Sequence, residues 1–109
     1  MSEEYLGKAL DLSESIAYAE GAVVSKTLLN KKAGTLTLFA FDKGQSLSEH
    51  TSPYDATVHV VDGEATLMIG GEEKKAKAGE MVIMPANIPH DVQARERFKM
   101  LLIMIREKE

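Results

Sequence analysis

Short apolar segments, most of them closed by glycine, proline, asparagine or aspartate, recur along this chain from residue 22 onward. Segments of this length, rich in β-branched residues, are typical of strands and too short for helices. The sequence therefore predicts strands at residues 23–29, 35–41, 57–61, 65–69, 81–84 and 98–106. Short strands and turns at fairly regular spacing favour an all-β sandwich or barrel.

Two dipeptides that contain glycine mark turns between these strands. Asp62-Gly63 closes the strand predicted over residues 57–61, and Gly70-Gly71 closes the one over 65–69. Glycine adopts positive φ angles without a steric cost, so Gly70-Gly71 predicts a two-residue hairpin turn.

The strand predicted over residues 98–106 carries apolar side chains at both parities. Its even positions from Met100 to Met104 and its odd positions from Leu101 to Ile105 are all apolar. One face can fill the barrel, and the other must be covered by a neighbouring sheet or a second subunit. In so small a domain we expect a partner chain, which predicts a homodimer.

Residues 1–21 have the least regular pattern. Leu6, Leu10 and Ile16 form a weak helical face, because Gly7 and several serines interrupt it. We expect an N-terminal arm over residues 1–21 that is extended or partly helical. A single barrel domain should follow over residues 22–109.

Length and composition exclude several classes of protein. The 109 residues make one ordinary domain, and 13 Lys and Arg against 17 Asp and Glu give a net charge of −4. This charge argues against binding to nucleic acid or anionic lipid, and the lack of cysteine excludes disulfides and thiol nucleophiles. No apolar run approaches the roughly 18–20 residues of a membrane span, and the acidic N-terminus differs from a signal peptide. We therefore expect a soluble, cytoplasmic protein without nucleic-acid or membrane partners.

The histidines are the main candidates for chemistry, because common phosphate-binding, nucleophile and metalloprotease motifs are absent. Two segments around them share a spaced pattern, with landmarks at Gly44, His50, Gly63, Gly79, Pro85 and His90. Together these segments resemble the two motifs of the cupin family, over residues of roughly 35 to 105. The resemblance is to small single-domain bacterial members of the cupin 2 conserved barrel type. It implies a double-stranded β-helix, or jelly-roll barrel.

The resemblance also implies positions for a metal-binding cage. Its four ligand positions correspond to His50, Ser52, Ala56 and His90, so two imidazoles are kept and two ligands are replaced. A glycine of the second motif has become Asn87, which tolerates left-handed backbone geometry. We take His50 and His90 as candidate metal ligands, and His50, Ser52 and His90 as the candidate ligand pocket.

Two alternatives remain for the metal, since a pair of imidazoles holds a divalent ion loosely. The pocket is either metal-free or holds one weakly bound divalent ion of unknown identity. Strand alternation points Glu49 and Asp91 away from the barrel interior, which leaves Asp55 as the best spare carboxylate. By the same alternation His59 lies on the face opposite Ala56, and we expect it to be structural.

Two functions follow from these residues. The first is a binding barrel that holds a small molecule in an internal pocket. The alternative is a metal-dependent enzyme of dioxygenase, isomerase or cyclase type, or one in which His50 and His90 act as general acid and base. A purely structural role is a third possibility, and the methionines serve as core filling or, alternatively, as a soft copper site. Neither the catalytic residues nor the ligand can be named from the sequence.

Overall fold

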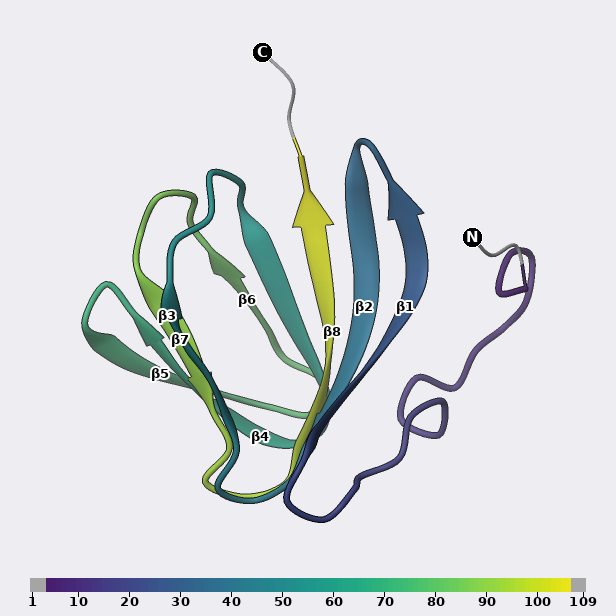
Figure 1. The fold of residues 1–109 in the computed structure, drawn as a ribbon, viewed down its shortest axis with the longest axis horizontal. Coiled ribbons are helices and arrows are strands. Elements are labelled where there is room, and N and C mark those ends of the chain that lie inside the picture. The colour runs from purple at the N-terminus through teal and green to yellow at the C-terminus, as the bar shows by residue number, and fades with distance from the viewer. Residues whose placement is uncertain (1–3, 107–109) are drawn as a thin grey trace.

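The structure is a computed structural model that describes residues 4–106 (Figure 1). The first three residues of the expected arm and the last three of the expected barrel lie outside it. The described part contains eight strands: β1 (Val23–Lys31), β2 (Gly34–Phe41), β3 (Ser46–His50), β4 (Ala56–Ile69), β5 (Glu72–Lys77), β6 (Met81–Met84), β7 (His90–Gln93) and β8 (Phe98–Ile105). None of these residues is helical, so the described chain has no helix that is long and apolar enough to cross a bilayer.

The strands pair in the order β1-β2-β8-β4-β7-β3, and β5 and β6 also pair with β4. Every pairing is antiparallel. The first half of β4 lies between β6 and β8, and its second half lies between β5 and β7. The sheet therefore curls through β4 into an open barrel with β1, β2 and β8 on one side and β3, β5 and β7 on the other (Figure 1). The prediction of an all-β barrel is confirmed.

The prediction of a turn at Asp62-Gly63 is wrong, because β4 runs through it without a break. A register shift between Val60 and Asp62 marks a β-bulge there, which lets one strand bend from one sheet into the other. Gly63 has φ 74°, and a Cβ at this position would lie 2.2 Å from the Arg97 carbonyl oxygen. Glycine therefore permits the bend rather than ending the strand.

The sequence missed β3, β5 and β7, which are short and mostly polar. In β5 every residue except Ala76 is exposed, so its run of charged residues has no apolar pattern that would indicate a strand. The hairpin that leads into β5 is confirmed, because Gly70 and Gly71 have φ values of 58° and 84°.

The barrel core contains a pair of stacked aromatic rings. Phe41 of β2 and Phe98 of β8 are fully buried, with ring centroids 4.6 Å apart. Around them pack small and aliphatic side chains from β4, β6 and β7. Replacing either ring with alanine should cost about 3–5 kcal/mol.

The N-terminal arm covers part of the outer face of β1, β2 and β8. It is built from turns, and its Ile16 packs on Leu38 and Ala40 of β2 in a second apolar cluster. The Tyr18 hydroxyl donates to Asp62 at 2.5 Å, and the largely buried Lys99 donates to the Ser13 carbonyl at 2.5 Å. Burial, followed by the hydrogen bond to Asp62, raises the pKa of Tyr18 above its usual range. These contacts fix the arm to the barrel.

Candidate functional site

The pairing of β3 with β7 places the two predicted site histidines side by side. His50 is the register partner of His90, and their ring centroids lie 4.5 Å apart at an interplanar angle of 71°. The edge of one imidazole therefore meets the face of the other. His90 is 3% exposed, whereas His50 is exposed at the end of an edge strand.

A β-bulge in β3 decides which side chain meets His90. Leu47 pairs with Val92 and both belong to the interior core, and His90 lies two residues before Val92 in β7. Strict alternation would place Glu49 opposite His90. The register shift between Leu47 and His50 adds one residue to β3, so that the imidazole and not the carboxylate lies on the interior side.

Both imidazoles are held by the same kind of hydrogen bond. His50 Nδ1 lies 2.8 Å from the Ser48 carbonyl oxygen, and His90 Nδ1 lies 3.1 Å from the Ile88 carbonyl oxygen. A carbonyl oxygen only accepts, so Nδ1 of each ring carries the proton and donates it. In the neutral rings, both Nε2 atoms therefore keep a free lone pair, the arrangement that leaves an imidazole ready to bind a ligand.

The Nε2 atom of His90 is the chemically open position of the site. Within residues 4–106 it has no hydrogen-bond partner, yet no side-chain nitrogen or oxygen there is both fully buried and unpaired. This atom must therefore lie at the small part of the ring that solvent reaches. Burial, assisted by the nearby His50, lowers the pKa of His90, while the Ile88 hydrogen bond and Asp91 oppose the shift. A lowered pKa keeps the ring neutral at pH 7 and its lone pair free.

Ser52 lies in the loop between β3 and β4. Its carbonyl accepts from Asn87 N at 2.7 Å, which ties this loop to the one between β6 and β7. Both loops lie at the same end of the barrel (Figure 1). The Ser52 hydroxyl accepts from Tyr54 N at 3.1 Å and lies 3.9 Å from Met104 Sδ, a contact that the sequence did not reveal. Asn87 has φ 65°, which confirms the left-handed turn expected at this position.

The remaining candidates are placed by the parity of β4. Ala56 is buried and pairs with Met84 and Met104, so a methyl group occupies this interior position. His59 has the opposite parity and pairs with Met81 and Leu101. It is half-buried on the outer face of the sheet and is not part of the histidine pair.

The carboxylates close in sequence to the two histidines form other hydrogen bonds or are exposed. Asp55 Oδ1 accepts from Ala86 N at 2.9 Å, so this spare carboxylate holds the turn before β7. Glu49 is exposed, and Asp91 Oδ1 accepts from Gln93 Nε2 at 3.1 Å. Among residues 4–106, no group of three or more His, Asp or Glu side chains could hold a metal ion. Two imidazoles alone do not fit a tightly held divalent cation.

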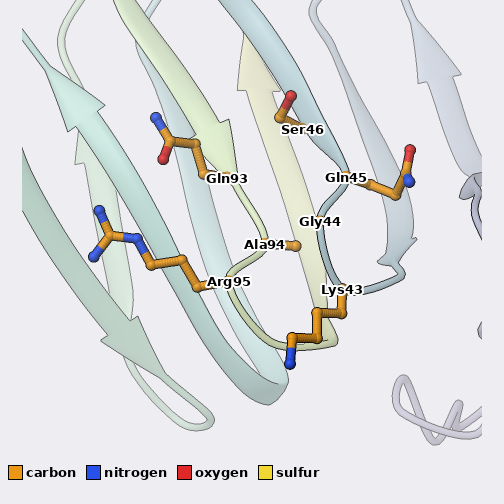
Figure 2. A pocket seen from close by; sticks show the side chains of 7 residues that line it. All are labelled: Lys43, Gly44, Gln45, Ser46, Gln93, Ala94 and Arg95. Carbon is orange, nitrogen blue, oxygen red and sulfur yellow. The ribbon is translucent and has the colours of Figure 1, made fainter.

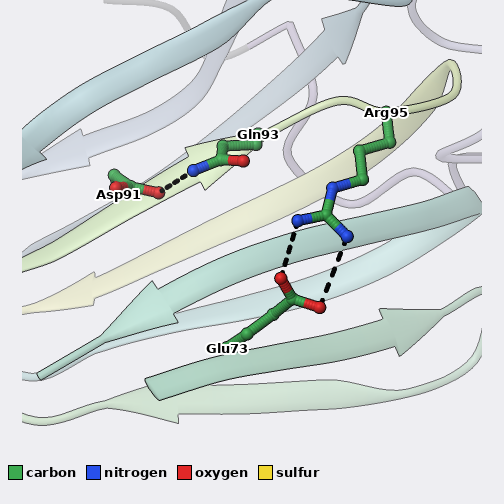
Figure 3. Close-up of polar contacts among 4 residues, drawn as sticks. All are labelled: Glu73, Asp91, Gln93 and Arg95. Atoms are coloured by element: carbon green, nitrogen blue, oxygen red, sulfur yellow. Dashed lines mark hydrogen bonds and ion pairs between the residues drawn. The ribbon is translucent and has the colours of Figure 1, made fainter. Parts of the chain in front are cut away.

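A hollow of about 350 Å³ lies at the other end of the β3–β7 ladder (Figure 2). It is lined by Lys43, Gly44, Gln45, Ser46, Gln93, Ala94 and Arg95. Its cations have carboxylate partners: Arg95 binds Glu73 at 2.6 Å (Figure 3), and Lys43 lies 3.9 Å from Glu96. This hollow is spatially separate from the histidine pair and offers no unpaired charge.

Comparison with known proteins agrees with the motif spacing and the curled antiparallel sheet. The family model described as the cupin domain matches residues 37–106. The chain belongs to the cupin family. The expected double-stranded β-helix fold is confirmed by this match and by the solved cupins that the chain resembles.

Several of these relatives are bacterial. A conserved protein of unknown function from Streptococcus pyogenes is 35% identical, with a TM-score of 0.89, and the match covers 94% of this chain and 90% of that one. A cupin 2 conserved barrel domain protein from Leptotrichia buccalis is 44% identical, with a TM-score of 0.83 over 86% of this chain. This cupin spans only 46% of that longer chain. An uncharacterized protein from Aquifex aeolicus is 26% identical over 94 residues, which are 84% of this chain and 78% of that one.

Proposed function

We propose that this cupin binds a small molecule at the mouth of its barrel, with His50 and His90 as the polar contacts that orient it. The observation that carries the proposal is a pair of adjacent imidazoles whose Nε2 atoms have no partner within the described residues, with that of the nearly buried His90 ring at the part of the ring that solvent reaches. Two open acceptors side by side can take hydrogen-bond donors from a ligand that displaces water. Ser52, in the neighbouring loop, supplies a hydroxyl as a third contact.

The chemistry of these contacts favours a neutral ligand with hydrogen-bond donors. Two Nε2 lone pairs accept hydrogen bonds from hydroxyl or N–H groups. No hydrogen bond or ion pair of a Lys or Arg side chain within residues 4–106 involves the histidine pair. We therefore expect a neutral ligand to bind there in preference to a carboxylate or phosphate.

A divalent ion is part of the proposal only as a loosely held, exchangeable occupant. The two imidazoles leave its charge unbalanced, and Asp55, the best spare carboxylate, is bonded to Ala86 N. The ion is given no role in the binding of the small molecule.

A second candidate function is an enzyme in which His90 Nε2 takes a proton from the bound ligand. The lowered pKa of His90 favours it, because a neutral imidazole is available as a base. Turnover of a bound ligand that is lost in His90→Gln would favour the enzyme over the binding protein.

The test is a fragment screen by ¹H–¹⁵N NMR with neutral hydroxyl- and amide-bearing compounds, each paired with a carboxylate analogue. We expect neutral fragments to shift the signals of His50, His90 and Val92 in the wild type. The shifts should disappear in His50→Ala and His90→Ala and persist in His59→Ala, a matched control on the outer face. Fragments that bind only at the hollow near Arg95, or carboxylates that bind better, would overturn the proposal.

A further inference from the structure

The inner face of β2 changes along the strand from aromatic side chains to hydroxyls. Phe41 and Phe39 pack in the interior core, and the next residues on the same face, toward the β1–β2 turn, are Thr37 and Thr35. The residues between them belong to the outer cluster that packs against the arm. Two threonine side chains therefore lie on the interior side of β2, beyond the aromatic rings.

Strand pairing extends this surface onto β1. Thr27 is the register partner of Thr37, and Asn30 is the partner of Thr35. Ser25 lies two residues before Thr27 and shares its face. We call this surface the polar strip; it comprises Ser25, Thr27, Asn30, Thr35 and Thr37. None of its side chains is charged.

The side chains of the polar strip are available to a ligand. Within residues 4–106 none of the five forms a hydrogen bond. Thr35 and Thr37 are half-buried, and no side-chain nitrogen or oxygen of the described chain is both fully buried and unpaired, so solvent reaches both hydroxyls. The side chains that β1 contributes are exposed. Hydroxyl and amide groups both donate and accept hydrogen bonds.

The polar strip is connected to the histidine site through β8. Met104 is the register partner of Thr35, and its Sδ atom lies 3.9 Å from the Ser52 hydroxyl. Register partners have Cβ atoms about 5 Å apart, so one methionine separates Thr35 from Ser52. The β1–β2 turn and the loop that carries Ser52 lie at the same end of the fold (Figure 1). The strip therefore continues the surface on which the proposed ligand contacts lie.

We infer that the ligand is a neutral polyhydroxylated molecule of about disaccharide size, which extends from the histidine pair along the polar strip. The inference rests on the proposed function and adds the chemical class of its ligand. Imidazole Nε2 atoms that carry no proton only accept, so they bind hydroxyl protons, whereas the strip pairs with hydroxyls in either direction. The absence of charge in the strip favours a neutral molecule over an ionic one.

The length and the apolar border of the strip also fit a sugar. From Thr35 to Phe39 the inner face of β2 spans four residues, or roughly 13 Å, which is longer than one pyranose ring. Phe39 is half-buried and next to Thr37 on this face. An aromatic ring beside hydroxyls is suited to the C–H face of a sugar, because its negative π face attracts C–H groups.

A ¹H–¹⁵N NMR titration of the full chain tests the inference. The probes are maltose, cellobiose, trehalose and sucrose at up to about 50 mM, which detects millimolar dissociation constants. Cyclohexanol, a ring with a single hydroxyl, is the comparison compound. We expect at least one disaccharide to shift the amide signals of Thr27, Thr37 and His90 together. It should bind about tenfold more tightly than cyclohexanol, since it forms several more hydrogen bonds.

Thr37→Val removes one hydroxyl of the strip and keeps the β-branched shape of the side chain, so the strand should be preserved. It should weaken disaccharide binding about two- to tenfold and should not weaken the binding of cyclohexanol. The matched control is Thr57→Val, because Thr57 is also half-buried in a strand but lies on the outer face, between Ile83 and Ile103. This control should bind the disaccharide as the wild type does.

The titration separates failure of the inference from failure of the proposed function. Shifts at His50 and His90 with none in the strip would overturn the inference and leave the proposed function standing. Shifts in the strip with none at the histidines would support the ligand class and overturn the proposed function. No shift with any disaccharide, or equal weakening in Thr37→Val and Thr57→Val, would overturn the inference. Strip signals that move with protein concentration alone would also overturn it, because a second copy of the chain would then cover the strip.

Discussion

The two ends of the β3–β7 ladder have opposite chemistry. At one end, the His50 and His90 rings lie edge to face, with their Nδ1 atoms bonded and their Nε2 atoms without a partner in the described chain. At the other, the hollow of about 350 Å³ holds charged side chains that are already paired with carboxylates. The charged groups at the hollow are therefore already paired, whereas the histidine end offers open acceptors within the described chain. This difference is why the proposed site is placed at the histidine end.

The largest expected difference between the two ends is in Zn²⁺ binding, used as a probe of open imidazole nitrogens. Removing either ring should weaken Zn²⁺ affinity about tenfold or more, because a single imidazole remains. His50→Ala and His90→Ala should show this loss by isothermal titration calorimetry, and Arg95→Ala at the other end should bind as the wild type does. Equal losses in all three variants would remove the distinction between the ends.

The pH dependence of stability should also come from the histidine end. The pKa of His90 is lowered in the folded state, so below the usual imidazole pKa of about 6.5 the unfolded chain binds a proton that the folded chain resists. The stabilisation is therefore present above that pH and is lost on acidification, with a slope of at most about 1.4 kcal/mol per pH unit. Urea unfolding between pH 7.5 and 5 should show a flatter profile for His90→Gln. An unchanged slope would contradict the assignment.

Breaking the hydrogen bond that holds the turn before β7 should have a smaller effect on the free energy of unfolding. Asp55→Ala removes the acceptor for Ala86 N and should cost about 0.5–1.5 kcal/mol of unfolding free energy. Since the same loops carry Ser52 and Asn87, the His90 amide signal should also shift in an NMR spectrum. Asp55→Asn, which keeps the oxygen acceptor, should restore most of the stability. A His90 signal that stays in place would show that this turn does not position the ring.

The smallest effect on the free energy of unfolding is expected from substitutions that break the ion pairs at the hollow. Exposed ion pairs contribute about 0–1 kcal/mol, so Arg95→Ala and Lys43→Ala should change the free energy of unfolding by no more than that. The pair between Arg95 and Glu73 should respond to added salt, whereas the histidine end should not. Chemical denaturation at low and high ionic strength checks both statements. A loss well above 1 kcal/mol would show that the charged end holds the barrel together.

The sequence predicted much of the barrel and less of the site. Apolar β-branched segments identified β1, β2, β6 and β8, and the motif spacing identified His50 and His90. The sequence did not predict β5, because the side chains of this strand are mostly charged and only Ala76 is buried. The bulge between Leu47 and His50 left no sequence signal: alternation counted from His50 places Glu49 outside, whereas alternation counted from Leu47 would place it inside, and the sequence does not show that the two counts differ. The Nδ1 bonds depend on backbone carbonyls, whose directions follow from the folded chain and not from side-chain identity.

The central claim is that two neighbouring imidazoles present bare Nε2 atoms to a shared ligand. The most direct measurement is a long-range ¹H–¹⁵N correlation spectrum of the ¹⁵N-labelled protein above pH 7, which reports which nitrogen of each ring carries the proton. We predict protonated Nδ1 and unprotonated Nε2 in both His50 and His90, with both Nε2 signals shifting when Zn²⁺ is added. A proton on Nε2 of either ring, or a shift confined to one of them, would contradict the account.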